Sequence, residues 1–357
     1  LKDENLIFKS SGVRDTTRTV ILPFWNAHSF LTTYAAADGW QPTAELASGQ
    51  KPKASENILD RWILSKLQTV TKQVHAQMEK YQLYAVVPEL LAFIEDLTNW
   101  YIRLSRRRFW SDSKTGISQD TKDAYSTLYY VLVQYTKLFA PFAPFVSERI
   151  YQNLTDGLQN VPLSVHLCDM PQIDASLMDE ELEQRMALVQ NATELGRTIR
   201  AKEKIKNRQP LKEMLVITRD KAGRKAIEEN TELIKSELNV KNIKFSDDES
   251  QYVAIELKPN LKLLGRRLGG ELANFKKELE KINSSAALLN LLLKLEVGEP
   301  VQLVGQNFVS DDFLIERQPK DNRPLATNHG VSVLLDTKLT EDLEQEGLAR
   351  EVVNRVQ

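Results

Sequence analysis

The stretch SENILDRWILSKLQTVTKQV, residues 55–74, determines how the first half of the chain folds. Its apolar residues recur every three or four positions, which is the spacing of one face of an α-helix. These residues are Ile58, Trp62, Ile63, Leu67, Val70 and Val74. Ser55 or Asn57 can accept hydrogen bonds from the free amides of a first helical turn. We therefore expect a helix to begin directly after one of them.

Similar periodicity predicts further long helices on both sides of this stretch. An amphipathic helix is expected over residues 15–34, with a start or kink near Pro23, and a linker rich in Gly and Pro over residues 38–52. A second helix is expected to open at Pro88 and to reach about Leu104. Others follow at residues 120–139, 145–153 and 177–201, and residues 162–167 are expected to cross the bundle as an extended piece. Long helices joined by short links form a bundle.

The pattern changes after Pro210. Residues 211–218 and 240–245 are strand-like and enclose a helix at 224–238, so we expect the two strands to pair in parallel. A helix at 272–293, short strands at 301–309, 313–316 and 331–336, and a last helix at 341–356 complete the prediction. The fold class is therefore mainly α, a helical bundle followed by smaller α+β modules. Four parts are expected: residues 1–54 (a tail and linker), 55–202 (the bundle), 203–257 (a small α/β junction) and 258–357 (an α+β module).

Composition and motifs exclude several classes of protein. No apolar run approaches the roughly 20 residues that cross a bilayer, and Cys168 as the single cysteine excludes an internal disulfide or a cysteine-rich zinc cluster. We expect a cytoplasmic location. The sequence lacks the phosphate-binding patterns Gly-x-x-x-x-Gly-Lys and Gly-x-Gly-x-x-Gly and the zinc-binding pattern His-Glu-x-x-His, and its four histidines are scattered. The sequence predicts no catalytic residue, metal or cofactor in this chain.

Arginines and aromatic residues alternate in NWYIRLSRRRFW, residues 99–110. Arginine beside aromatic rings suits contact with phosphates and stacking on bases. The predicted nucleic-acid contacts in this stretch are Arg103, Arg106, Arg107, Arg108 and Trp110. The alternative is that the aromatic residues pack inside the bundle while the arginines pair with Asp60, Glu95 or Asp96.

Positive charge is concentrated in residues 197–225, which carry eleven basic and three acidic side chains, a net charge of +8 in a chain whose total is −2. Such a patch usually faces nucleic acid, although a solvated junction is the alternative. Its predicted contacts are Arg197, Arg200, Lys204, Lys206 and Arg208. A third stretch, residues 258–270, combines turn residues with cations and suggests a loop that binds phosphate through Lys258, Arg266 and Arg267.

An ordered series of motifs resembles the C-terminal half of isoleucyl-tRNA synthetases. The motifs are GVR (12–14), LPFWN (22–26), LDRWILS (59–65), NWYIR (99–103), RRRFW (106–110), APFAPF (140–145), SVHL (164–167), RQPL (208–211), ELNVK (237–241), KPN (258–260) and EGLAREVV (346–353). They extend over essentially the whole chain, and the series is far more specific than any one motif.

The resemblance implies a class I anticodon-binding domain at about residues 55–201 whose partner is isoleucine tRNA. It also implies catalytic and editing domains in the same parent chain, with ATP and magnesium used by that parent. The family's His-Ile-Gly-His and Lys-Met-Ser-Lys-Ser signatures are absent, so we expect a piece of a longer enzyme that is inactive alone. With its single cysteine, the sequence resembles the branch of the family that lacks a C-terminal zinc site. That branch includes enzymes of the eukaryotic cytosol and of certain bacteria.

Three other functions are weighed against this one. The chain could be a helical scaffold whose basic patch docks an acidic protein, or the equivalent region of a valyl- or leucyl-tRNA synthetase. The motifs at residues 99–103 and 106–110 fit the isoleucyl family best. An autonomous enzyme is disfavoured because the catalytic motifs are missing.

Overall fold

The structure, a computed structural model, describes residues 9–110, 116–285, 287–296 and 298–356. The chain packs as two units, Leu1–Met186 and Ala187–Gln357. The boundary falls inside one helix, α9 (Glu180–Lys202). The expected division into four parts stays a prediction. Within the described residues, no helix combines the length and the apolar character needed to span a membrane.

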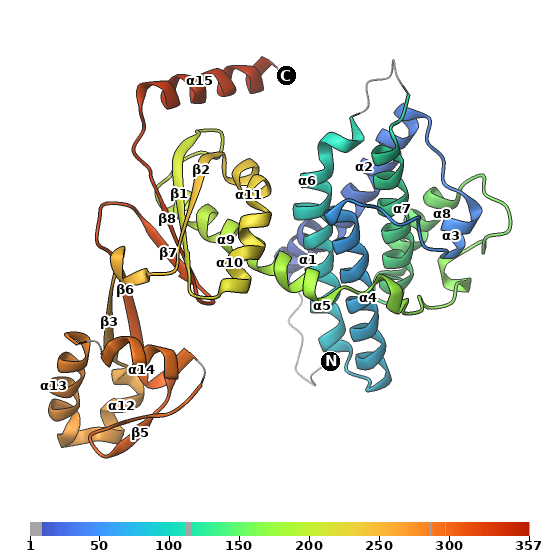
Figure 1. Cartoon of the computed structure of the whole chain (residues 1–357). Coiled ribbons are helices and arrows are strands. Elements are labelled where there is room, and N and C mark those ends of the chain that lie inside the picture. Colours follow the sequence, from blue (N-terminus) through green and yellow to red (C-terminus); the bar gives the residue numbers. More distant parts are fainter. Residues whose placement is uncertain (1–8, 111–115, 286, 297, 357) are drawn as a thin grey trace. The chain divides into compact units, whose positions relative to one another are not determined.

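The first unit is built from helices, most of which run side by side (Figure 1). Its helices are α1 (Ser10–Thr16), α2 (Leu22–Asp38), α3 (Ala44–Ser48), α4 (Ile58–Glu79), α5 (Leu83–Glu95), α6 (Arg103–Ser105), α7 (Gln119–Phe139), α8 (Pro144–Thr155) and the start of α9. Helix α7 contacts α2, α3, α4 and α8, so it is the central element. The predicted bundle is confirmed.

Buried tyrosines on α7 hold the bundle together. Tyr135 is 1% exposed, packs edge-on against Phe24 with ring centroids 5.1 Å apart, and stacks on Phe93 at 5.4 Å. Its hydroxyl donates to the carbonyl of Leu90 at 3.0 Å. Tyrosine contributes a large apolar surface, and the bonded hydroxyl avoids the penalty of an unpaired buried donor.

Asn57 caps α4 as expected, since its side chain accepts from the amide of Leu59. The predicted start of the next helix at Pro88 is wrong, because α5 begins at Leu83 and Pro88 lies inside it. Proline removes one helical hydrogen bond. Packing compensates locally, since Val86 and Leu90 on either side of the proline are fully buried.

Two other expectations concern irregular segments. The irregularity expected near Pro23 is confirmed as a π-helical turn, Thr17–Ile21, directly before α2. The extended piece predicted at residues 162–167 is wrong, because Val165–Leu167 forms a 3₁₀ turn. The carboxylate of Glu148 accepts from the Ser164 hydroxyl at 2.8 Å and the Val165 amide at 2.9 Å, and this local capping favours the turn.

The second unit contains a four-stranded sheet in the order β2-β1-β8-β7. Its strands are β1 (Leu211–Thr218), β2 (Val240–Ser246), β7 (Leu325–Asn328) and β8 (Val331–Leu335). Strands β1 and β2 pair in parallel, as predicted, and β8 joins β1 antiparallel. The single helix expected between β1 and β2 is two, α10 (Lys221–Glu229) and α11 (Thr231–Leu238). Both pack with α9 on one face of the sheet (Figure 1).

A smaller α+β part completes this unit. Strand β3 (Val253–Pro259), which was not predicted, pairs antiparallel with β6 (Phe313–Pro319), and β4 (Val301–Leu303) forms a hairpin with β5 (Gln306–Phe308). Its helices are α12 (Leu261–Leu268), α13 (Leu272–Asn283) and α14 (Ala287–Glu296), the last two replacing one predicted helix, and α15 (Glu341–Val356) follows β8. The fold class predicted from the sequence is confirmed.

Gly196 sets how closely α9 approaches α11. A Cβ added there would lie 2.3 Å from a methyl carbon of Leu238, which is fully buried, so the side chain or one of the helices would have to shift. Overpacking of this kind costs about 1–3 kcal/mol, whereas replacing a helical glycine by alanine alone gains up to about 1 kcal/mol.

We therefore expect Gly196→Ala to lower the free energy of unfolding in urea denaturation. Gly265→Ala on α12 is the matched control, because a Cβ there meets nothing within 4 Å. The control should leave stability unchanged or raise it. Equal stability of the two variants would contradict the close contact between α9 and α11.

Candidate nucleic-acid interface

A buried carboxylate organises one end of the first unit. Asp60 on α4 is 0% exposed and accepts four hydrogen bonds. The Ser55 hydroxyl donates at 2.6 Å, the Tyr101 hydroxyl at 2.7 Å, and the Arg108 guanidinium through Nη1 at 2.7 Å and Nη2 at 2.8 Å. Both oxygens are satisfied, which a buried charge requires.

Arg108 joins this carboxylate to the start of α7. Its Nη2 also bonds to the Asp120 carboxylate at 2.7 Å, and its side chain is only 11% exposed. Burial would lower the pKa of Arg108, but the hydrogen bonds that it donates to Asp60 and Asp120 raise it above its ordinary value. Burial, together with the charge of Asp60, raises the pKa of Tyr101, so this hydroxyl remains a donor.

The structure thus corrects the interpretation of Arg108 as an RNA contact, since its donors are occupied by two carboxylates. The alternative set out above, pairing with Asp60, describes this arginine. Trp100 is 8% exposed and packs inside the bundle. Arg103 is exposed.

Arg106, Arg107 and Trp110, which we call the basic cluster, face outward from the same 3₁₀ turn, Arg106–Phe109. Phe109 anchors this turn: it is 1% exposed and packs edge-on against Phe30 at 5.1 Å. Trp110 is 55% exposed, and the Arg106 guanidinium lies 5.7 Å from its ring centroid. Arg107 is exposed and has no ion-pair partner among the residues that the structure describes.

A buried cation shapes a second basic surface in the second unit. Arg200, 3% exposed, donates to the carbonyls of Lys206 and Gln209 at 3.0 Å each and to that of Asn239 at 3.3 Å. Burial lowers the pKa of Arg200 to about 10. The Asn239 side chain donates to the carbonyl of Arg208 at 2.9 Å. These bonds fix the path of the chain between Arg200 and Gln209.

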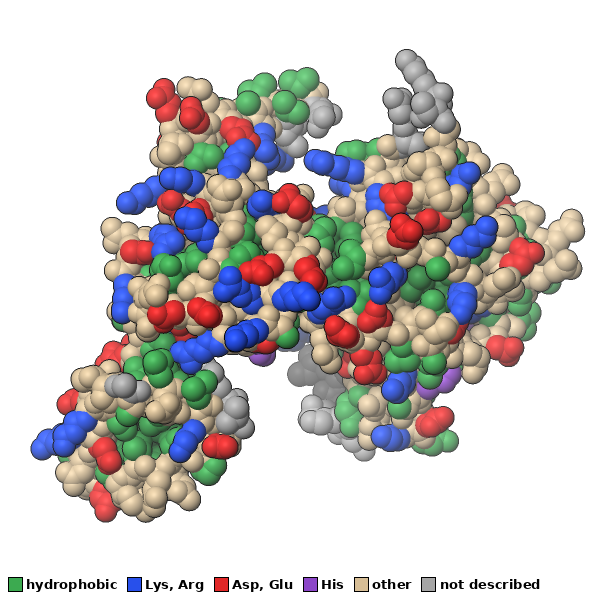
Figure 2. Space-filling model, viewed as in Figure 1, with side chains coloured by type: hydrophobic (Ala, Val, Ile, Leu, Met, Phe, Trp, Pro, Cys, Tyr) green, Lys and Arg blue, Asp and Glu red, His purple; other side chains and the backbone are tan. Residues whose placement is uncertain are grey.

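This path presents the basic turn, which we define as Lys202, Lys204, Lys206 and Arg208. All four are exposed, although Lys206 pairs with Glu351 at 3.0 Å. Arg200 is therefore internal, contrary to its predicted role as an RNA backbone contact. Arg197 is also engaged, since it pairs with Glu237 and lies 3.5 Å from Glu194. Figure 2 shows basic side chains interspersed with acidic ones on the visible face.

The third predicted stretch, residues 258–270, is not a loop, because it forms the end of β3 and helix α12. Phosphate binding by this stretch stays a prediction. Lys258 pairs with Glu316 at 2.7 Å and Glu256 at 3.6 Å. Arg267 pairs with Asp312 at 3.0 Å and covers the Phe308 ring, whereas Arg266 is exposed.

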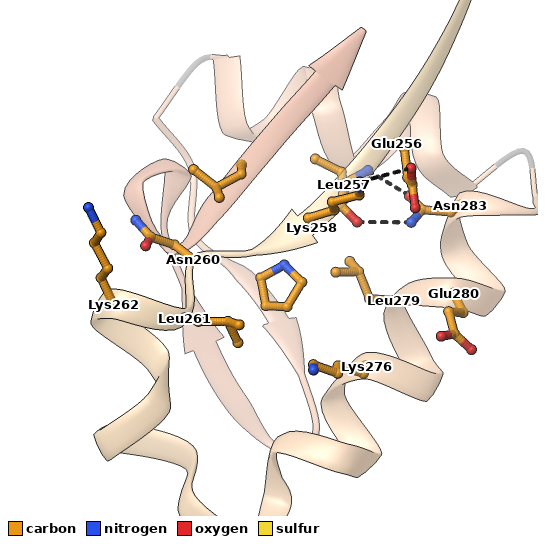
Figure 3. A pocket seen from close by; sticks show the side chains of 12 residues that line it. Glu256, Leu257, Lys258, Asn260, Leu261, Lys262, Lys276, Leu279, Glu280 and Asn283 are labelled. Carbon is orange, nitrogen blue, oxygen red and sulfur yellow. Dashed lines mark hydrogen bonds and ion pairs between the residues drawn. The ribbon is translucent and has the colours of Figure 1, made fainter. Parts of the chain in front are cut away.

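A cavity of about 690 Å³ lies beside Lys258. Figure 3 shows the side chains that line it. Its floor is aliphatic, formed by side chains that include Leu257, Leu261 and Leu279. Within the described ranges, no group of three or more His, Cys, Asp or Glu residues could hold a metal ion.

Comparison with known proteins agrees with this geometry. Residues 60–215 match the family described as the anticodon-binding domain of tRNA ligase. Residues 60–215 are therefore similar to a helical anticodon-binding domain.

Three individual proteins that the chain resembles are all tRNA ligases for one amino acid, isoleucine. The chain is 37% identical to isoleucine-tRNA ligase of Clostridium novyi (98% of the chain, 33% of the relative). It is 38% identical to the same enzyme of Protochlamydia amoebophila and of Bdellovibrio bacteriovorus (100% of the chain and 33% of the relative in each). Over its whole length the chain is thus a homologue of isoleucine-tRNA ligases, and it spans about a third of their length.

These relatives confirm the resemblance found in the sequence, and they do not favour the scaffold or the valyl and leucyl alternatives. The assignment to a branch without a zinc site stays a prediction. The predicted contacts with RNA also stay predictions, apart from the corrections given above.

The hydrogen bonds around Asp60 predict that removing Asp60 lowers the free energy of unfolding more than removing Asp120, the other carboxylate that holds Arg108. Asp60→Ala would leave a buried guanidinium and two hydroxyls without their acceptor, and such a loss costs about 3–5 kcal/mol. Asp120→Ala removes a partner that is 54% exposed, for which about 0–1 kcal/mol is expected. Urea denaturation of both variants measures the difference. Equal costs would show that Asp60 does not hold this end of the bundle.

Proposed function

We propose that this chain forms the part of an isoleucine-tRNA ligase that binds the anticodon stem and loop of isoleucine tRNA. One observation carries the proposal: the basic cluster stands on a rigidly anchored turn within the residues that match an anticodon-binding domain. Because the backbone of this turn is already fixed, RNA binding does not have to order it, and that entropic cost is avoided.

The cluster combines the two kinds of contact that a single-stranded loop offers. Arg106 and Arg107 supply charge-assisted hydrogen bonds to phosphates. Trp110 supplies an exposed ring on which an unpaired base can stack, next to the Arg106 guanidinium. Lys202, Lys204 and Arg208 of the basic turn are proposed to follow the RNA backbone, a role that Arg197 and Arg200 are less able to fill.

The ligase reaction itself is also a proposal. The relatives are about three times as long as this chain, and we propose that ATP-dependent attachment of isoleucine takes place on a catalytic domain outside this sequence. ATP and magnesium would bind there, in the cytoplasm, where the tRNA partner is found.

The basic cluster can be tested by charge reversal. Arg106→Glu with Arg107→Glu should weaken binding of an isoleucine tRNA transcript at least tenfold. Each lost phosphate contact should also lower the slope of log affinity against log salt concentration by about one. Fluorescence anisotropy at several salt concentrations measures both quantities.

The matched control reverses two exposed cations elsewhere on the bundle, Lys72→Glu on α4 and Arg149→Glu on α8. It should change affinity much less. If both double variants bound tRNA as the unaltered chain does, the basic cluster would not be an RNA contact.

A further inference from the structure

A second cavity lies in the first unit, between the segment 40–53 and the first half of α7. Its volume is about 540 Å³. Helix α7 contributes Gln119, Lys122, Asp123 and Ser126. Their spacing places all four on one face of the helix. The opposite wall comes from the segment before α4, including α3, and we call the cavity the linker pocket.

Several anchors hold this linker in one conformation. Thr43 caps α3 by accepting from the Leu46 amide, and Lys51 pairs with Asp174 at 3.0 Å. At its far end, the Ser55 hydroxyl bonds to the buried Asp60. Gly49 (φ +111°) packs so closely that an added Cβ would lie 3.2 Å from the Gln134 amide on α7. The pocket is therefore preformed.

The pocket contains an oriented aromatic ring. Trp40 is partly exposed and stacks on Tyr125, with centroids 5.3 Å apart and planes inclined by 22°. The Tyr125 hydroxyl is in turn fixed by Asp38 at 2.7 Å. One face of the indole is thus covered, and its position is set before any ligand arrives.

Within the part of the chain that the structure describes, two lysines without an ion-pair partner line the same pocket. Lys53 and Lys122 both line the pocket and are exposed, and among the described residues neither has an ion-pair partner. A ring next to two free ammonium groups matches a nucleotide, in which a flat base is linked to a phosphate.

Two carboxylates line the same pocket, Glu45 and Asp123. They would repel a free phosphate ion, so inorganic phosphate alone is a poor fit. Carboxylates do accept hydrogen bonds from the amino groups of bases. The set of side chains therefore favours a complete nucleotide whose base carries an amino group.

We propose that the linker pocket binds one unpaired nucleotide of the tRNA, with its base against Trp40 and its phosphate between Lys53 and Lys122. This inference rests on the proposed function, because the RNA is the one held by the basic cluster. The two sites share a framework: Arg108 holds Asp120, in the helical turn that also carries Gln119 and Lys122.

The phosphate contact is tested by Lys53→Glu with Lys122→Glu in the full chain. Affinity for an isoleucine tRNA transcript should fall at least tenfold, and the salt slope should be lower by about one, because one phosphate contact is lost. The control is Lys72→Glu with Lys80→Glu, two exposed lysines within α4 and at its C-terminal end, and it should bind as the unaltered chain does. Circular dichroism checks that each variant is folded.

The base contact is tested by replacing each loop nucleotide of the tRNA, one at a time, with an abasic one. One position should weaken binding to the unaltered chain and have little further effect on Trp40→Leu, because the lost contact is the same. Trp40→Phe, which keeps a ring, should retain most of the effect.

The outcomes separate this inference from the proposed function. Normal binding by the lysine variant, with weakened binding by the Arg106 and Arg107 variant, would overturn the linker pocket alone. Weakened binding without any abasic position that depends on Trp40 would reduce the pocket to a contact with the RNA backbone and overturn the nucleotide site. Failure of the unaltered chain to bind tRNA would overturn both.

Discussion

The carboxylate of Asp60 is the constraint on which this end of the bundle depends. A charge removed from water must receive hydrogen bonds on both oxygens, and here the donors come from three separate segments. Ser55 lies just before α4, Tyr101 lies in the helical segment Asp96–Ile102 that follows α5, and Arg108 lies in the 3₁₀ turn Arg106–Phe109. These segments can satisfy Asp60 only in one arrangement. That arrangement turns Arg106, Arg107 and Trp110 toward solvent.

The second unit also contains a buried ion that fixes the backbone around it, but here the ion is a cation. Arg200 is buried without a carboxylate partner among the hydrogen bonds described, and three backbone carbonyls accept its donors instead. The chain must curl around the guanidinium to bring these carbonyls together. The lysines of the basic turn lie on this segment and are exposed to solvent. In both units, a buried ion fixes the backbone that carries the exposed cations. The basic residues are therefore of two kinds: internal ones that hold the fold, and exposed ones that can contact a ligand.

Much of the fold could be predicted from the sequence because apolar spacing carries the information. The helices α4, α7, α8 and α9 and the parallel pair β1 and β2 follow directly from periodicity and capping residues. The start of α5 could not be predicted, because the local preference of Pro88 is overridden by packing on either side. The turn at residues 165–167 depends on Glu148, which lies on another helix.

The candidate site was predictable as a region and not residue by residue. Arg106, Arg107 and Arg108 look equivalent in the sequence, but Arg108 is internal because it pairs with Asp60, 48 residues away, and with Asp120. Arg200 likewise looks like any basic residue in a positively charged segment. The linker pocket left no local signal, because its walls come from two segments about 70 residues apart.

The measurement that tests the central claim most directly compares two tRNAs on the unaltered chain. Fluorescence anisotropy would follow binding of isoleucine tRNA, and of the same tRNA with a changed anticodon, at two salt concentrations. An anticodon-binding role predicts tighter binding of the native anticodon, with both affinities reduced by salt. Equal affinities for the two tRNAs, or no binding of either, would contradict the account.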